Sequence, residues 1–514
     1  MGKIYNYEAP SSTWKCNIPA YFFYTFAHDE LLIRLKRMTL SYPCRENIHK
    51  IQKTININLM MKKKYSLFLL MVSSLFLMSS QKDGNPVLTN PFDSSSESNC
   101  VARDKIVIIS DLHLGNDLSY SETVKHLARL EQFLNEVRES ESIKELVIAG
   151  DMLDEWYIPS RVDTYGAGTQ ADFVKKSVEA NKGVFDLLNA IIKDGKIKVT
   201  YLPGNHDMGF LPEHIDMAMP GVNQARDEGE KYPVGTYYPD GYPQIAIEHG
   251  HRYDFFNAIA PEANESEAPG PITPPGYFFA RIAANSFTNP TTLEAATKVP
   301  SLKLNDPGNA EQYSKFVYYS LWKGVLENVI YVNDSFSDPI FTTKVGKFTK
   351  NYAVNDILPQ NSPTDGSIQM KLYNGLFTQA NWDARQKYNN VAVLNEINSS
   401  IKGSLATEFL DDQGETQYFK NPDSNVRLVV FGHTHKPMIK AYTNLKEEAC
   451  LYVNSGTWED QKTRDKNVVI DQDVIKMDFV VIDPVGAEKK TLLVKLCQYK
   501  YGKHALKDID LVEL

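Results

Sequence analysis

Apolar residues form short continuous runs that alternate with longer stretches of helical spacing. The continuous runs are rich in β-branched residues, as in strands that are buried on both faces. They occupy residues 105–110, 145–150, 198–204 and 244–250. Between them, residues 121–138 and 171–193 place apolar side chains at helical spacing, and Ser121 is the expected N-cap of the first helix. This alternation predicts a layered α/β fold.

The regular pattern breaks between residues 253 and 425. This region begins with a Pro/Gly-rich stretch and continues with aromatic-rich segments of helical spacing. These segments occupy residues 276–289, 311–331 and 378–399. Strand-like runs return at residues 426–432, 450–456, 479–483 and 492–497. We therefore predict one α/β domain, formed by residues 105–252 and 426–514, with residues 253–425 as a large, mainly helical insertion.

A signal-like segment lies at residues 60–80. Three lysines, Lys62 to Lys64, precede an apolar run of 14 residues, which is short for a membrane span but typical of the h-region of a signal peptide. Because a signal peptide begins a chain, we expect residues 1–59 to be an over-called extension and residues 81–104 to be a linker. An uncleaved anchor is the alternative. The expected location is periplasmic or secreted, with no transmembrane domain beyond this segment.

Composition excludes several classes of protein. The 514 residues include 55 Lys and Arg against 64 Asp and Glu, and a net charge of −9 argues against nucleic-acid binding through global charge. The five cysteines show no CxxC pair, which argues against a zinc ribbon and a disulfide scaffold. Cys450 and Cys497 lie in strand-like runs, where a disulfide and two free thiols are both compatible with the sequence. No feature predicts an oligomeric state.

Polar clusters follow five of the predicted strands. They are Asp111-Leu112-His113, Gly150-Asp151 with Asp154, Asn205-His206-Asp207, His249-Gly250-His251 and His433-Thr434-His435. Ligands of open α/β sheets bind beyond the carboxyl ends of the strands, so we expect these clusters to converge. A single histidine at such a position is usually a hydrogen-bonded loop residue, but five ordered clusters argue for a common site.

The residue types in these clusters indicate a metal centre. Carboxylate, amide and imidazole groups without thiolates favour divalent Mn, Fe or Zn over a thiolate-held structural zinc. Two such ions about 3.5–4 Å apart clamp a phosphoryl group and activate a water molecule for in-line attack. The sequence therefore predicts two divalent ions, of unknown identity, acting on a small phosphorylated substrate.

The clusters resemble the motif set of the calcineurin-like metallophosphoesterases, DxH, GDxxD, GNH[DE], HG and GHxH. This chain reads DLH, GDMLD, GNHD, HGH and GHTH, within residues 105–252 and 426–498. The resemblance implies an α/β sandwich of two sheets flanked by helices. The stretch GDMLDEW has Glu155 and Trp156 where protein Ser/Thr phosphatases have Arg and Gly. It partly resembles bacterial UDP-2,3-diacylglucosamine hydrolases, which have Arg in place of His206 and lack the insertion.

The resemblance implies a role for each cluster. One ion would be held by Asp111, His113, Asp151 and His435, and the other by Asp151, Asn205, His249 and His433, with Asp151 bridging. His206 matches the catalytic histidine, a general acid that Asp154 orients, and Asp207 could assist it. His251 and Arg252 follow a ligand and could bind substrate phosphate, although a structural role suits them equally. His126 is expected at the surface of the first helix.

The most complete interpretation is an exported binuclear phosphoesterase that hydrolyses a phosphate ester or a pyrophosphate. A non-catalytic scaffold that binds a partner is the alternative, and an exported metal-binding protein is a third. Non-catalytic relatives usually lose metal ligands or the catalytic histidine, which are all present here, and a metal-binding protein would not need His206 or Asp154. The insertion leaves the sheet directly after the HGH cluster, so it is expected to cap the active site, unless it is an unrelated interaction domain.

Overall fold

The computed structural model describes residues 90–93, 103–227, 234–261, 267–268, 272–404, 406–462, 476–486, 488–500 and 502–514. From Pro91 onward these residues belong to one compact unit. The predicted extension, the signal segment and most of the linker lie outside the described residues. Within the described ranges, no helix is both long and apolar enough to span a membrane.

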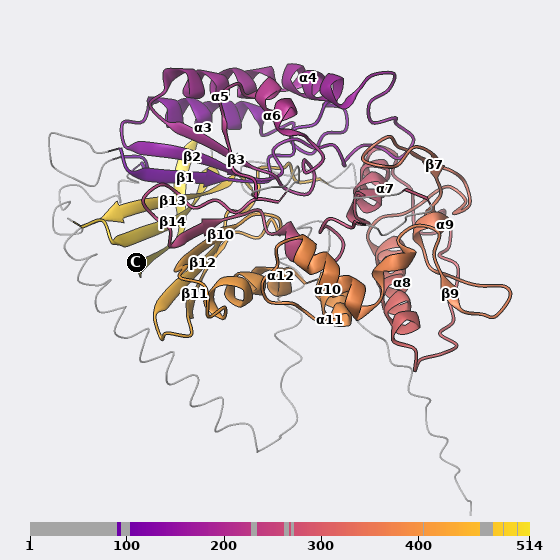
Figure 1. Ribbon diagram of the computed structural model, residues 1–514. Helices are drawn as coiled ribbons and strands as arrows, with labels where there is room; N and C mark the ends of the chain where they lie inside the picture. The colour runs from indigo at the N-terminus through magenta and orange to yellow at the C-terminus, as the bar shows by residue number, and fades with distance from the viewer. Residues whose placement is uncertain are drawn as a thin grey trace, which may run out of the picture. The chain divides into compact units, whose positions relative to one another are not determined.

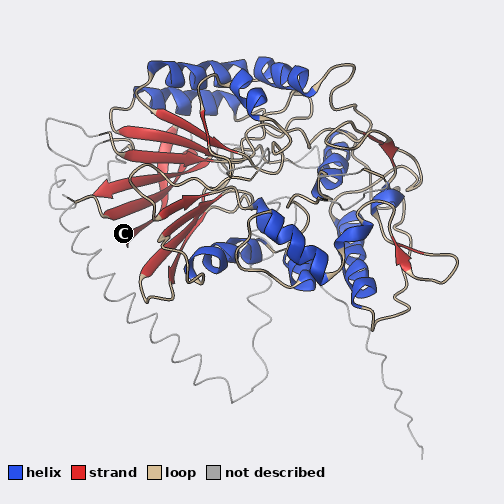
Figure 2. Ribbon diagram, viewed as in Figure 1, coloured by secondary structure: helices blue, strands red, loops and turns tan. Residues whose placement is uncertain are grey.

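Two sheets form the centre of this unit (Figures 1 and 2). The first has seven strands in the order β15-β14-β13-β1-β2-β3-β4, and the second has four in the order β11-β12-β10-β5. The strands of the first sheet are β1 (Lys105–Ile109), β2 (Ile143–Ala149), β3 (Lys198–Leu202), β4 (Asn223–Gln224), β13 (Asp478–Val485), β14 (Thr491–Lys500) and β15 (Lys503–Glu513). Those of the second are β5 (Ile245–Ile247), β10 (Leu428–Phe431), β11 (Met438–Thr443) and β12 (Ala449–Asn454).

Alternating side chains of β1 build two different cores. Ile106 and Ile108 belong to an apolar cluster with Ile247 of β5 and Val430 of β10, which fills the space between the sheets. Val107 and Ile109 belong to a second cluster on the opposite face of the first sheet. Four helices cover that face: α3 (Leu127–Glu139), α4 (Gln170–Ala180), α5 (Lys182–Asp194) and α6 (Pro212–Ala218). The predicted α/β sandwich flanked by helices is confirmed.

The chain between β5 and β10 has its own apolar cluster and no strand of either large sheet in its described residues. Its helices are α7 (Gly276–Thr288), α8 (Ala310–Asn328), α9 (Val354–Ile357), α10 (Gln379–Tyr388), α11 (Ile397–Gly403) and α12 (Thr407–Gly414), followed by a π-helix at Glu415–Phe419. Two short hairpins complete it: β6 (Phe341–Thr342) with β7 (Asn351–Tyr352), and β8 (Gln360–Asn361) with β9 (Ile368–Gln369). Helix α12 contacts β10 and β12, so the insertion packs directly on the second sheet.

Three predicted helices differ from those observed because distant polar groups set their ends. Helix α3 begins at Leu127 rather than near Ser121, because the Asp460 carboxylate accepts hydrogen bonds from the backbone N–H groups of residues 124–126. The predicted helix at 171–193 is divided at Asn181, whose buried side chain donates to the Gly115 carbonyl. The segment 378–399 is divided near Asn389, whose side chain bonds the backbone of Ile259.

Other predictions also need correction. His126 is buried rather than exposed, and its Nδ1–H donates to the Trp458 carbonyl at 2.8 Å. Strand β15 was not predicted. It is the outermost strand of its sheet and much of it is exposed, so its sequence is polar and lacks the apolar run of a buried strand. Cys450 and Cys497 are buried free thiols, which decides against a disulfide between them.

Candidate metal centre

Five of the predicted ligands share an uncommon backbone conformation. Their φ angles are 53° for Asp111, 46° for His113, 50° for Asp151, 67° for His433 and 56° for His435. Residues with a Cβ rarely adopt this left-handed region, and such strained positions concentrate at functional sites. Each lies in a loop directly after a strand. Strands β1 and β2 pair in parallel within one sheet, and β5 and β10 within the other, so the loops emerge at corresponding edges.

Donor atoms of Asp111, His113 and His435 form the first group. The His435 Nε2 atom lies 3.0 Å from Asp111 Oδ1 and 3.3 Å from His113 Nε2. His113 Nε2 is also 3.9 Å from Asp111 Oδ1 and 3.8 Å from Asp151 Oδ2. Two imidazole nitrogens and a carboxylate oxygen at this spacing could hold one cation.

Donor atoms of Asp151, Asn205 and His249 form the second group. The His249 Nε2 atom lies 3.1 Å from both Asp151 Oδ2 and Asn205 Oδ1. His249 Nδ1–H donates to the Ala149 carbonyl at 2.9 Å, so Nε2 is the ring nitrogen that faces the group and could bind an ion. The His433 ring lies beside this group, with its centroid 5.2 Å from that of His249. Asp151 Oδ2 faces both groups, as a bridging ligand must.

Two glycines leave room for the donors. A Cβ atom at Gly204 would overlap the Asp151 carboxylate, and one at Gly150 would overlap the His249 ring. Gly150 also has φ of 90°, which side chains rarely tolerate. The buried, oxygen- and imidazole-rich donor set and this cradle fit divalent ions.

Carboxylates and histidines shift one another's pKa within the buried site. Burial would lower the pKa of the histidines, but the carboxylates Asp151 and Asp111 outweigh it and raise the pKa of His249 to about 9. Burial is likewise outweighed at His435, where Glu459 and Asp111 raise the pKa to about 9. Burial opposes ionisation of Asp151, yet His249 and His206 hold its pKa well below the usual value. The carboxylates and imidazoles of the site thus stabilise one another's charged forms against burial.

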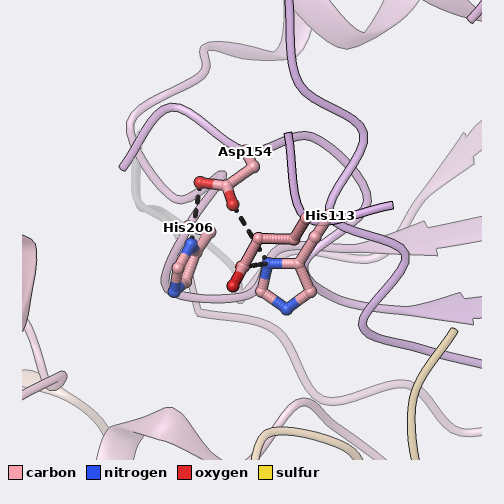
Figure 3. A group of neighbouring side chains, drawn as sticks. His113, Asp154 and His206 are labelled. Atoms are coloured by element: carbon pink, nitrogen blue, oxygen red, sulfur yellow. Dashed lines mark hydrogen bonds and ion pairs between the residues drawn. The ribbon is translucent and has the colours of Figure 1, made fainter. Parts of the chain in front are cut away.

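Asp154 connects two imidazoles, as Figure 3 shows. Its Oδ1 atom lies 2.8 Å from His206 Nδ1, and its Oδ2 atom lies 3.2 Å from His113 Nδ1. The backbone N–H groups of Trp156 and Tyr157 each donate to Oδ1 at 2.8 Å, which fixes the carboxylate. His206 keeps 13% of its side chain exposed and His435 keeps 24%, so both rings reach the open edge of the site.

Three carboxylates that the sequence did not indicate contact the candidate ligand histidines. Glu122 lies 3.1 Å from His113 Nδ1. Asp254 lies 3.2 Å from His433 Nε2, and Glu459 lies 3.4 Å from His435 Nδ1. Such partners orient imidazole ligands and raise their basicity. None of the three belongs to a recognisable sequence motif, because only the folding of the chain brings each carboxylate next to its histidine.

The remaining candidates occupy different environments. His251 is fully buried, and neither of its ring nitrogens has a hydrogen-bond partner among the described residues. The Arg252 guanidinium is already engaged by Glu248 at 2.6 Å and Asp227 at 3.3 Å, so it is not free to bind phosphate. The carboxylate of Asp207 accepts from the backbone N–H of Gly204 and Met152, so it stabilises the loop rather than assisting His206.

Part of the chain is similar to a known protein family. Residues 104–280 match the model of the family described as calcineurin-like phosphoesterase. Among solved structures, the chain is similar to a dimetal phosphatase from Danio rerio, with 9% identity and a TM-score of 0.32 over 80% of this chain and 99% of that one. That likeness is too distant to assign a function. No match was found among curated proteins. Residues 104–280 are therefore similar to the calcineurin-like phosphoesterase family, and the two sheets with their donor-bearing loops agree with that similarity.

Proposed function

We propose that the protein hydrolyses a small phosphate ester or pyrophosphate at a centre of two divalent ions. The position of Asp151 carries this proposal, because its Oδ2 atom lies 3.1 Å from His249 Nε2 of one donor group and 3.8 Å from His113 Nε2 of the other. Asp111, His113, Asp151 and His435 would hold one ion, and Asp151, Asn205, His249 and His433 the other. When bound, the ions would neutralise the phosphoryl group and lower the pKa of an attacking water molecule.

His206 is the proposed general acid. Its Nδ1–H points to Asp154 at 2.8 Å, so Nε2 is the nitrogen that can deliver a proton to the leaving oxygen. Burial lowers the pKa of His206, but Asp154 and Asp151 outweigh it and raise the pKa above its usual value. The proton on Nε2 is thereby favoured before substrate is bound.

His251 is a candidate for binding substrate phosphate, because neither ring nitrogen has a hydrogen-bond partner in the part of the chain that the structure describes, and the ring centroid lies 5.4 Å from that of His249. We also propose export, on the basis of the lysines and apolar run within residues 60–80. A non-catalytic scaffold is less well supported, since it would have no use for the Asp154–His206 pair.

Hydrolysis of chromogenic phosphate esters tests the proposal. The purified protein should lose activity after chelation and regain it with Mn²⁺, Fe²⁺ or Zn²⁺. A parallel panel of nucleotides, sugar phosphates, phosphodiesters and nucleotide-sugar pyrophosphates would identify the substrate class. Failure to hydrolyse any member, with both ions bound, would favour the scaffold.

A further inference from the structure

Asp411 is a buried carboxylate in helix α12 of the insertion, outside every motif that supplies a candidate ligand. Its Oδ1 atom accepts from the Thr434 hydroxyl at 3.0 Å and from the Tyr452 hydroxyl at 2.5 Å. Thr434 lies between His433 and His435, the two histidines of the GHTH loop. The insertion therefore bonds directly to the loop that supplies one candidate ligand to each ion.

The GHTH loop needs such support. Both histidines have positive φ angles, 67° at His433 and 56° at His435, which the surrounding structure must maintain. Asn454 adds to the support, because its Nδ2 atom donates to the Gly432 carbonyl at 2.6 Å and contacts Thr434 Oγ1 at 3.0 Å. Asp411 Oδ1 also accepts from Asn454 at 3.3 Å, so one oxygen collects three side-chain donors around the loop.

Asp254, near the start of the insertion, touches the same loop. Its Oδ2 atom lies 3.2 Å from His433 Nε2, while its Oδ1 atom accepts from the Phe256 backbone at 2.8 Å. Both ends of the insertion thus contact the GHTH loop through carboxylates.

We propose that the insertion is part of the metal centre, with Asp411 as a positioning residue that holds the GHTH loop in its ligating conformation. This inference rests on the proposed dimetal centre. Asp411 would not touch the ions or the substrate; it would act through the Thr434 hydroxyl.

Metal affinity of the full-length protein is the direct test, measured by titrating the chelated protein with Mn²⁺ or Zn²⁺. Asp411→Ala and Thr434→Val should each weaken binding by about 10–100-fold, the usual effect of losing a partner that orients a ligand. The double variant should be no weaker than the worse single variant, because both changes remove the same bond. Thr434→Ser keeps the hydroxyl and should restore affinity to near that of the unchanged protein.

Asp412→Ala is the matched control. This neighbouring carboxylate is about half exposed and also connects α12 to the second sheet, through Lys440 at 2.6 Å and Tyr442 at 2.8 Å in β11, but it does not reach the GHTH loop. It should leave affinity within about twofold of the unchanged protein. If Asp411→Ala does not fold, Thr434→Val against Thr434→Ser decides the question.

Unchanged affinity in both Asp411→Ala and Thr434→Val would overturn the inference while leaving the dimetal proposal intact. Equal losses in Thr434→Val and Thr434→Ser, or in Asp411→Ala and Asp412→Ala, would also overturn it, because the loss would then not depend on this bond. Absence of metal binding by the unchanged protein would overturn both proposals.

Discussion

His206 and Asp154 form the one pair in the site whose proposed task is proton transfer rather than ligation. His206→Ala should preserve metal content and lower turnover by about 10²–10⁴, the usual contribution of a general acid. The loss should be smaller for an ester with a good leaving group, since such a group needs little protonation. Asp154→Asn should give a milder loss of turnover together with weaker metal binding, because Asp154 also contacts His113 Nδ1. Steady-state rates on a series of leaving groups, with metal analysis of each variant, would reveal this; equal losses across the series would exclude the acid role.

Glu155 provides a test through pH. Burial raises its pKa to about 7, from 4.5 for an exposed group. Below pH 4.5 both folded and unfolded chains are protonated. As pH rises from 4.5 to 7, the unfolded chain ionises first, so the native state loses stability, by about 3 kcal/mol for a shift of this size.

Because Gln cannot ionise, Glu155→Gln should gain about 3 kcal/mol relative to the unchanged protein between pH 4.5 and pH 8. Denaturant unfolding at several pH values measures this difference. Glu139→Gln, at the exposed end of α3, should change stability by less than about 0.5 kcal/mol throughout. A difference for Glu155→Gln that does not vary with pH would contradict the account.

The sequence predicted which residues would gather, but not the groups that support them. Asp111, His249 and His433 follow buried strands, and their convergence follows from parallel pairing at neighbouring edges. Glu122, Asp254 and Glu459 follow no such rule, because their partners are brought close only by loops whose course the local sequence does not determine. His251 and Arg252 are adjacent in sequence, yet their environments differ. The ring nitrogens of His251 have no hydrogen-bond partner among the described residues, whereas the Arg252 guanidinium forms ion pairs with Glu248 and Asp227.

Helix α7 connects the insertion to the loop that follows Asp154. The Arg281 side chain of α7 is fully buried and donates to the carbonyls of Ile158, Pro159, Ser160 and Thr342 at 2.7–3.1 Å. A guanidinium spreads five N–H donors over a planar fork, whereas an ammonium offers three donors from a single atom and reaches fewer of these separated carbonyls.

Arg281→Lys should therefore lower the free energy of unfolding by roughly 2–4 kcal/mol, because buried carbonyls lose their donors. Chemical denaturation measures the change. Arg161→Lys is a suitable control, since Arg161 pairs with Asp334 at the surface and is 60% exposed; its effect should stay within about 1 kcal/mol. Equal effects of the two substitutions would show that the carbonyl cluster does not need the guanidinium.

Element type was predictable where packing determines it, as for β1, β2 and β3, whose apolar runs face two cores. The ends of the helices were not predictable, because they depend on hydrogen bonds between residues distant in sequence. Asp460 accepts from the backbone at the start of α3, and Asn181, at the α4–α5 junction, donates to the Gly115 carbonyl. The α12 helix and its π-helical continuation were also missed, since their few apolar residues pack on the second sheet rather than on a regular helical stripe.

At the scale of the whole molecule, the sheets and the insertion form one compact unit. The sequence led to the expectation that the insertion caps the site, which stays a prediction. Its contacts through Asp254 and Asp411 give the insertion a second proposed role, that of supporting the GHTH loop of the metal centre. Substitutions in the insertion can therefore affect metal binding as well as substrate choice, and the two effects must be measured separately.

If Asp151 bridges two ions, the number of ions bound per chain must depend on its carboxylate. Mass spectrometry of the native protein, or elemental analysis after dialysis, should find two divalent ions in the unchanged protein. Asp151→Asn should lose at least one of them together with activity, because a bridging carboxylate neutralises both cations. Asn205→Ala, which removes a ligand of one ion only, should be less damaging. Two ions and normal activity in Asp151→Asn, or fewer than two in the saturated unchanged protein, would contradict the account.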